Sequence, residues 1–455
     1  MQSLASRVAR SVAKPFVVFV ERYYPDPFVF LIALTAVAFG LALVLTDATP
    51  IGALTAWGEG LAGLLSFMAQ IAITLLTAHA LAHTDAVSSG LQRLARLPRS
   101  VTGCYVLVVV VSCLSSLLAW SFGLVAGALI ARAVAAEAAN RDLRVHYPLV
   151  VAAAYCGLAV WHMGYSGSAP LMVATPGHAM ESLTGILPVS ATLLTHWNLL
   201  AIAATITVLA VVCPLLHPGA DEVRGLDRDS LPIESAPPER SAKLSWTPAN
   251  RIDNARWLTL GFGILLAAYL VSYFLTAGLA LNLNIVNWTF LALGLLLTRS
   301  PAHYVELILN AGKTVGAIFI QYPFYAGIMG LMAGTGLVQI TANWFTDVAT
   351  AETLGFWAFL AGGLVNLFVP SGGGQWAVQG PVFLEAAREL GTDPAVIVMG
   401  IAYGDQWTNL IQPFWTIPLL AIAGLHMRDI MGYCFVLFLV SGVALGGAIL
   451  YAGML

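Results

Sequence analysis

Long apolar runs alternate with short polar connections along most of the chain. About twenty apolar residues span a bilayer as a helix, so the pattern predicts regular transmembrane helices at 27–46, 60–83, 188–216, 257–275, 280–298, 314–334 and 429–453. Four further apolar stretches carry Gly, Ser or Pro near their middles, at 101–138, 147–180, 354–390 and 394–424. We therefore expect an all-α polytopic membrane protein with several interrupted helices.

Composition supports this class. Of 455 residues, 59% are hydrophobic and 9% are charged, whereas a soluble domain carries roughly 25% charged residues. The net charge of −3 gives no sign of a nucleic-acid partner. The five cysteines are scattered through apolar runs without metal spacing, so we interpret them as small core residues and expect no cofactor.

Two segments lie outside the apolar pattern. The basic start places Arg7, Arg10 and Lys14 on one helical face, which predicts that residues 1–26 form an interfacial amphipathic helix. Residues 217–256 are charged and rich in proline, which is typical of a linker outside the membrane.

The linker and a connecting helix at 257–278 separate two similar halves, 27–216 and 279–455. Matched residues occur at nearly one offset: Tyr155 and Tyr403 are 248 positions apart, Gln70 and Gln321 are 251 apart, and Ser121 and Ser371 are 250 apart. Three matches in the same order indicate an internal repeat, which is typical of transporters.

The number of crossings predicts that the second repeat is inverted. If 101–138 and 354–390 are re-entrant hairpins, the first repeat crosses four times and the connecting helix once. With a cytoplasmic N-terminus, every Lys and Arg except Arg388 then lies on the cytoplasmic side, as the positive-inside rule requires. We expect a cytoplasmic linker and a periplasmic C-terminus. If each hairpin instead consisted of two full spans, each repeat would gain two crossings and the predicted inversion of the second repeat would stay the same.

The second hairpin contains the stretch "VPSGGGQWAVQGP" (369–381). Each glycine costs roughly 1 kcal/mol in a helix interior, so we expect Gly372, Gly373 and Gly374 to let the backbone turn at the hairpin tip and approach a ligand. Ser371, Gln375 and Gln379 would supply donors and acceptors. The alternative is a glycine-lined face for helix packing.

The second break, "AYGDQWTNLIQPFW" (402–415), contains an intramembrane carboxylate, which is a functional candidate by default. We expect Asp405, with Thr408 and Asn409, to couple transport to a cation. The coupling cation would be H⁺ or Na⁺. If a metal ion binds, we expect it to be Na⁺ near Asp405. The alternative is that Asp405 caps a helix end or faces a water-filled crevice.

The first-half counterpart is "WHMGYSGSAPLMVATPGH" (161–178), in which His162, Ser166 and Ser168 are candidates for substrate binding. His162 could instead be a packed core histidine. "GYSGS" is close to a nucleophile elbow, but Ser168 replaces the second glycine and no triad partners are visible. His79 and His83 share a helical face and could hold a metal, although no third ligand is visible.

Neither break contains Lys or Arg. An anionic substrate would therefore be held by helix dipoles, hydroxyl groups and amides, which suits one small carboxylate better than a polyanion.

Several stretches resemble the short-chain fatty acid transporter family (AtoE type) of the ion transporter superfamily. They are "YYPDPFVF", "YSGSAPLMVATPG", "QYPFYAG", "VPSGGGQWAVQGP", "AYGDQWTNLIQPFW" and "LHMRDIMGYC". The resemblance implies an elevator-type secondary active symporter for acetoacetate or butyrate in the bacterial inner membrane. It also implies a scaffold domain, a moving transport domain and a homodimer.

The resemblance adds Ser121 and Gly123 to the substrate-binding candidates. "SFG" at 121–123 and "SGG" at 371–373 stand where dicarboxylate members of the superfamily have Ser-Asn-Thr tips. Alternatives are a C4-dicarboxylate carrier or an ion antiporter of the same superfamily. Alternatives from other functional classes are an intramembrane enzyme using Ser166 or Asp405, and a channel or membrane scaffold. We expect no enzyme, because no base and nucleophile pair is visible.

Overall fold

The computed structural model describes Pro15 and residues 27–63, 65–178, 180–226, 247–278, 283–312, 315–370 and 372–455. Every regular element in these ranges is a helix, so the all-α class is confirmed. Apart from Pro15, the interfacial helix expected at 1–26 lies outside the described residues, as do Ser371 and linker residues 227–246.

Four helices, two of them short, lie in the described range from residue 27 to residue 95: α2 (Pro27–Leu45), α3 (Pro50–Gly60), α4 (Leu65–Ala82) and α5 (Asp85–Ala95). The span predicted over 60–83 corresponds to α4, which begins at Leu65, and α3 precedes it as a separate short helix. Gly60 packs closely on α16 (Gly316–Gly334), because a Cβ on Gly330 would lie 2.6 Å from the Gly60 Cα. The backbones of α3 and α16 therefore approach directly, as small residues allow in membrane proteins.

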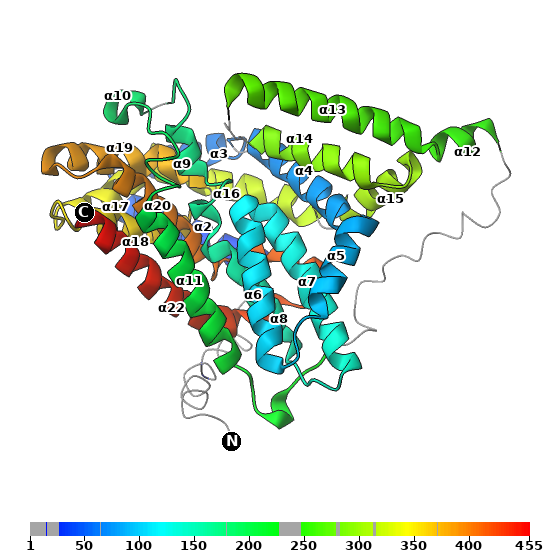
Figure 1. The fold of residues 1–455 in the computed structure, drawn as a ribbon. Coiled ribbons are helices and arrows are strands. Elements are labelled where there is room, and N and C mark those ends of the chain that lie inside the picture. Colours follow the sequence, from blue (N-terminus) through cyan, green and yellow to red (C-terminus); the bar gives the residue numbers. More distant parts are fainter. Residues whose placement is uncertain are drawn as a thin grey trace.

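The connecting helix α13 (Arg256–Ala277) lies along the outer edge of the molecule (Figure 1). Only 17% of its most apolar window is buried in the protein, so most of its surface is available to lipid. Its neighbours in sequence are η3 (Ala220–Glu222), α12 (Pro248–Asp253), α14 (Leu283–Leu297) and α15 (Pro301–Gly312). An exposed ion pair between Asp85 and Arg299 ties the start of α5 to the α14–α15 connection, with nitrogen–oxygen distances of 2.6 and 2.5 Å.

Two pairs of helices form hairpins. The first consists of α6 (Val101–Leu118) and α7 (Trp120–Asn140), which turn at Ala119. The second consists of α18 (Leu354–Asn366) and α19 (Gly372–Leu390). Both α6 and α7 are long and apolar enough to cross a bilayer, so the re-entrant nature of these hairpins stays a prediction.

Two other helices are interrupted in their middles. In the first half, α8 (Tyr147–Tyr155) is followed by η1 (Cys156–Ala159), η2 (Trp161–Met163), α9 (Ser168–Val173) and the short α10 (Glu181–Thr184). In the second half, α20 (Pro394–Asn409) is separated from α21 (Pro413–Ala423) by three residues. Pro413 has no backbone N–H to continue α20, so it begins a new helix instead.

The remaining helices are α11 (His196–Leu215), α17 (Leu337–Thr346) and α22 (Met427–Gly453). α16 and α17 form a bent pair at 71°, with the turn made by Gly336 at a φ of +77°. In the part of the chain that the structure describes, six helices are long and apolar enough to cross a membrane, or seven counting this pair. The multi-pass membrane class is thereby confirmed.

Candidate functional site

The middle of α20 carries an almost fully buried carboxylate. Asp405 is 1% exposed, and its Oδ1 lies 3.8 Å from Nδ1 of His162. His162 belongs to η2, so the break in the first half meets α20 of the second half here. Within the described residues, Asp405 Oδ2 has no hydrogen-bond partner. A buried carboxylate with so few partners is costly in an apolar protein, which makes Asp405 the chemical centre of the site.

Two contacts hold the ring of His162, and a third holds its backbone. It stacks on Trp161 with centroids 4.1 Å apart, its backbone N–H donates to Gln406 Oε1 at 2.9 Å, and Nε2 accepts from the Ala169 N–H at 3.1 Å. A neutral imidazole that accepts at Nε2 carries its proton on Nδ1, so an N–H faces Asp405. Since 3.8 Å is longer than a hydrogen bond, His162 alone does not satisfy the carboxylate.

The triple glycine lies at the beginning of α19. A Cβ on Gly372 would overlap Cε1 of His162 and lie 3.2 Å from Asp405 Oδ2. A Cβ on Gly373 would meet only ordinary contacts, 3.4 Å from Met172 Cε and 3.9 Å from Ser168 Cβ. Gly372 is therefore the glycine that lets the positive end of the α19 dipole approach Asp405.

The expectation that these three glycines form the turn itself is wrong. They occupy the first turn of α19, and the described glycines with positive φ lie elsewhere: Gly177, Gly185, Gly278, Gly336, Gly391 and Gly424. The chain reverses before Gly372. Close approach, rather than backbone freedom, is what the structure requires of glycine at this point.

A cluster of oxygens surrounds the last turn of α20. Asn366 Nδ2 lies 2.8 Å from the Asp405 carbonyl, 2.8 Å from Thr408 Oγ1 and 2.7 Å from Asn409 Oδ1. An amide nitrogen has two hydrogens, so three oxygens exceed what it can satisfy. Asn409 Nδ2 also lies 3.5 Å from Asp405 Oδ1. The three cation-coupling candidates thus lie together, in an environment rich in acceptors.

Sequence reasoning missed Asn366, which holds this cluster from the end of α18. It is fully buried, and its own carbonyl accepts from Gln412 Nε2. Asn366 is the only polar residue in "AGGLVNLFVP", so no neighbouring polar residue marks it as part of a motif. Its isolation in an apolar run was the available signal, because a polar side chain at membrane depth is costly unless it is paired.

The two repeat-matched tyrosines make reciprocal bonds across the molecule. Tyr155 of α8 donates to the carbonyl of Asn409 at 2.7 Å, at the break of the second half. Tyr403 of α20 donates to Asn198 Oδ1 at 2.7 Å, and Asn198 Nδ2 donates to the Met163 carbonyl at 3.1 Å, at the break of the first half. Tyr155 thus bonds the break of the second half directly, whereas Tyr403 reaches the break of the first half through Asn198 of α11.

The first hairpin ends beside the loop that follows η2. The Trp120 N–H donates to Ser166 Oγ at 3.0 Å, so Ser166 caps α7. Ser121 is fully buried, and a Cβ on Gly123 would collide with Ser116 of α6, so Gly123 serves helix packing. None of these contacts reaches Asp405. Ser168, at the start of α9, is half-buried and lies close to Gly373.

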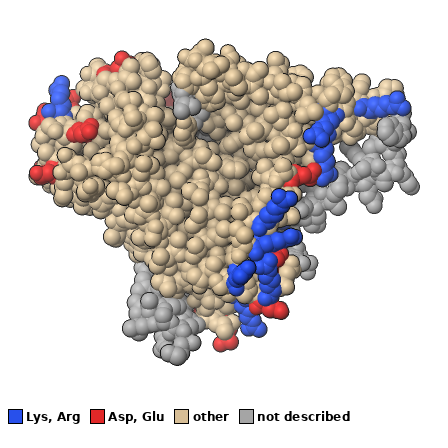
Figure 2. Space-filling model, in the orientation of Figure 1, with Lys and Arg blue, Asp and Glu red and all other residues tan. Residues whose placement is uncertain are grey.

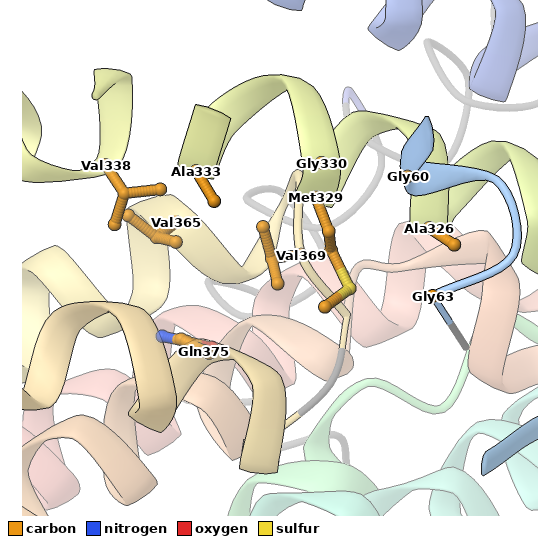
Figure 3. Close-up of a pocket in the computed structure, with 10 residues that line it drawn as sticks. All are labelled: Gly60, Gly63, Ala326, Met329, Gly330, Ala333, Val338, Val365, Val369 and Gln375. Carbon is orange, nitrogen blue, oxygen red and sulfur yellow. The ribbon is translucent and has the colours of Figure 1, made fainter. Parts of the chain in front are cut away.

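The two glutamines of α19 face α18. Gln375 Nε2 donates to the Gly362 carbonyl at 2.6 Å and to Gln379 Oε1 at 3.0 Å. Gln379 Nε2 donates to the Ala361 carbonyl at 3.3 Å. These bonds fix the second hairpin as one unit. Gln375 additionally lines a cavity of about 230 Å³ between this hairpin and α3 and α16 (Figure 3).

The His79 and His83 rings stack with centroids 4.1 Å apart. Among the described residues, no group of three or more His, Cys, Asp or Glu side chains is placed to hold a metal ion. The five cysteines are free and buried, which agrees with their interpretation as core residues.

The whole chain resembles one transporter family. Residues 8–452 match the family model described as "Short chain fatty acid transporter". This chain belongs to the short-chain fatty acid transporter family. Two relatives, both named "Putative short-chain fatty acid transporter", match over nearly their full lengths. The Escherichia coli K12 protein is 40% identical over 440 residues, covering 97% of this chain and 98% of the relative. The Haemophilus influenzae Rd protein is 36% identical over 438 residues, covering 95% and 96%.

Two solved structures show distant likeness to this family member. Neisseria gonorrhoeae MtrF, whose title describes a class of antimetabolite efflux pumps, is 16% identical with a TM-score of 0.42 and coverage of 98% and 97%. The Alcanivorax borkumensis YdaH transporter is 14% identical with a TM-score of 0.42 and coverage of 94% and 99%. Family membership makes the chain a multi-pass membrane transporter and confirms the expectation that it is not an enzyme.

Proposed function

We propose that this transporter is a symporter that moves a short monocarboxylate, such as butyrate or acetoacetate, together with a cation. The observation that carries the proposal is the junction of three elements at Asp405: the middle of α20, the ring of His162 on η2, and the start of α19 at Gly372. A carboxylate substrate at the start of α19 would meet the positive end of the helix dipole.

The same junction explains why a cation would be required. Two carboxylates a few ångströms apart repel strongly in a medium of low dielectric constant. A proton or sodium ion at Asp405 would neutralise one of them before the site crosses the membrane. The oxygens of Thr408 and Asn409, which crowd around Asn366, are the type of ligand that a sodium ion uses. The cation is H⁺ or Na⁺, and separately applied gradients distinguish the two.

An elevator movement, with inverted repeats, is also part of the proposal. Tyr155 bonds to the Asn409 carbonyl, and Tyr403 reaches the Met163 carbonyl through Asn198 of α11. These bonds connect the two broken helices, which supports a transport domain that moves as a body. We propose the bacterial inner membrane, with a cytoplasmic N-terminus, a periplasmic C-terminus and a homodimeric assembly. Figure 2 shows Lys and Arg gathered towards the end where α5, α7 and α12 lie, which supports a cytoplasmic location for that end.

Competition of labelled butyrate uptake into proteoliposomes tests the substrate class. We expect unlabelled butyrate and acetoacetate to compete at least tenfold better than succinate or citrate, because the breaks contain no Lys or Arg to bind a second carboxylate. Protein-free liposomes provide the background for diffusion of undissociated acid. Stronger competition by succinate would favour a C4-dicarboxylate carrier instead.

A further inference from the structure

The helix α5 is too short to cross the membrane. Its 11 residues extend about 17 Å, little more than half of the roughly 30 Å that a span needs. It runs across the end of α4 and beside α7 (Figure 1), along the edge of the molecule where Figure 2 shows Lys and Arg side chains. Leu91 and Ala95 pack against the hydrophobic core, so the opposite side of α5 faces outward.

The outward side of α5 and the turn after it combine arginines with leucines. Arg93 lies in α5 and Arg96 is its C-cap in helical conformation, so the two exposed side chains share a face. Arg99, also exposed, follows in the turn. Beside them, Leu94 and Leu97 are 37% and 64% exposed. Exposed leucines next to arginines on one helix are typical of helices that lie in the headgroup layer of a membrane.

A further arginine holds the turn after α5 in place. Arg141, which follows α7, donates from Nη1 to the carbonyls of Arg96 and Pro98 at 3.0 and 3.2 Å. Its Nη2 lies 2.7 Å from Oε1 of Glu137, so the carboxylate of Glu137 is already paired. Because these bonds fix the turn on α7, an anion would bind to a preformed surface, which lowers the entropic cost of binding.

The protein leaves the charge of this surface without acidic partners. Asp85 is the single acidic residue of α5, and it is paired with Arg299. Among the described residues, Arg93, Arg96 and Arg99 form no ion pair. A guanidinium group binds a phosphate through two parallel hydrogen bonds. Three neighbouring arginines therefore favour a headgroup with a net negative charge over a zwitterionic one.

We propose that α5 lies in the headgroup layer and that Arg93, Arg96 and Arg99 bind the phosphate groups of anionic phospholipid, for which phosphatidylglycerol is the probe. The two leucines favour a lipid over a soluble phosphate. Leu94 and Leu97 leave water when α5 lies on a bilayer, whereas a soluble phosphate would leave both exposed. Each arginine close to an anionic membrane surface strengthens binding about fivefold. This surface lies outside the candidate site, so the proposal does not depend on the transported substrate.

A fluorescent probe at Leu97→Cys measures which lipid lies beside α5. The five native cysteines are buried, so a bimane reagent labels the new cysteine preferentially. The full-length protein is reconstituted in phosphatidylcholine vesicles in which part of the lipid is replaced by dibrominated phosphatidylglycerol or by dibrominated phosphatidylcholine. Bromine atoms quench a nearby bimane, so the dependence of quenching on lipid fraction gives the relative affinity of the two lipids. We expect phosphatidylglycerol to be preferred at least tenfold.

Two double variants with the same change in charge separate this surface from the net charge of the protein. In the labelled protein, Arg93→Gln with Arg96→Gln should lower the preference for phosphatidylglycerol at least fivefold. The control is Arg256→Gln with Arg388→Gln, which alters exposed arginines on α13 and α19 and should leave the preference unchanged. Size-exclusion chromatography verifies that each variant is folded, and the comparison of the two lipids without these substitutions stands in any case.

Several results would overturn the proposal. They are equal quenching by the two brominated lipids, no quenching by either lipid, an unchanged preference in the Arg93 and Arg96 variant, and an equal loss in the control. Loss of the preference with millimolar inorganic phosphate, but not with sodium chloride of the same ionic strength, would identify a soluble anion as the ligand instead. None of these measurements involves uptake of a carboxylate, so they test the proposal separately from the proposed function.

Discussion

Replacing Asp405 with asparagine is expected to abolish the accumulation of butyrate against its gradient. Asparagine keeps the shape of the side chain but removes the charge that would hold the cation beside His162. A tenfold cation gradient supplies about 1.4 kcal/mol, which supports about tenfold accumulation in one-to-one symport. Butyrate accumulation by Asp405→Asn should fall to the level seen without a cation gradient. Exchange of labelled for unlabelled butyrate should persist, because exchange requires no net movement of the cation.

The measurement uses proteoliposomes in which a pH gradient and a sodium gradient are imposed separately. Asp347→Asn is the matched control, because Asp347 is an exposed aspartate at the end of α17 and should behave as the wild type. Protein-free liposomes give the passive entry of undissociated acid. Undiminished accumulation by Asp405→Asn under both gradients would remove this carboxylate from coupling and leave it with a structural role.

Neighbouring glycines of the triple are expected to respond very differently to the same substitution. Gly372→Ala should lower butyrate uptake at least tenfold, because the new methyl group would overlap the His162 ring and crowd Asp405. Overpacking of this kind costs typically 1–3 kcal/mol. Gly373→Ala should retain most of the uptake, since its methyl group would meet only ordinary contacts with Met172 and Ser168.

Uptake is normalised to the amount of folded protein in the membrane, measured by size-exclusion chromatography after detergent extraction. This step separates loss of function from loss of protein. Equal losses in both variants would indicate that the glycines serve helix packing in general. Wild-type uptake by Gly372→Ala would show that close approach of α19 to Asp405 is not needed for transport.

The sequence predicted the class of fold because membrane burial leaves a strong pattern. Long apolar runs identify α11, α13 and α22 directly. Short helices such as α3 and α5 were missed, since their 11 residues are too few for a span. The position of α3 depends on its contact with α16, which lies far along the chain.

Some residues of the candidate site could likewise be predicted from the sequence, and others could not. Asp405 could be identified from the sequence, because a carboxylate in an apolar run is costly and therefore conspicuous. Composition alone could not distinguish Gly372 from Gly373, since the difference is made by His162, 210 positions earlier in the chain. Ser166 was expected to bind substrate, yet it accepts from the Trp120 N–H and caps α7. The role of Asn366 could be recognised only from the packing of α18 against α20.

Joint binding of substrate and cation at Asp405 is tested most directly by the butyrate affinity of the purified protein. Calorimetric titration with butyrate is carried out across a range of Na⁺ concentrations and of pH, on the wild type and on Asp405→Asn. Linkage requires that a cation which strengthens butyrate binding is itself bound more tightly with butyrate present. We expect the butyrate affinity of the wild type to rise at least tenfold with either Na⁺ or H⁺, and Asp405→Asn to lose this dependence. Wild-type affinity that is independent of both cations would contradict joint binding.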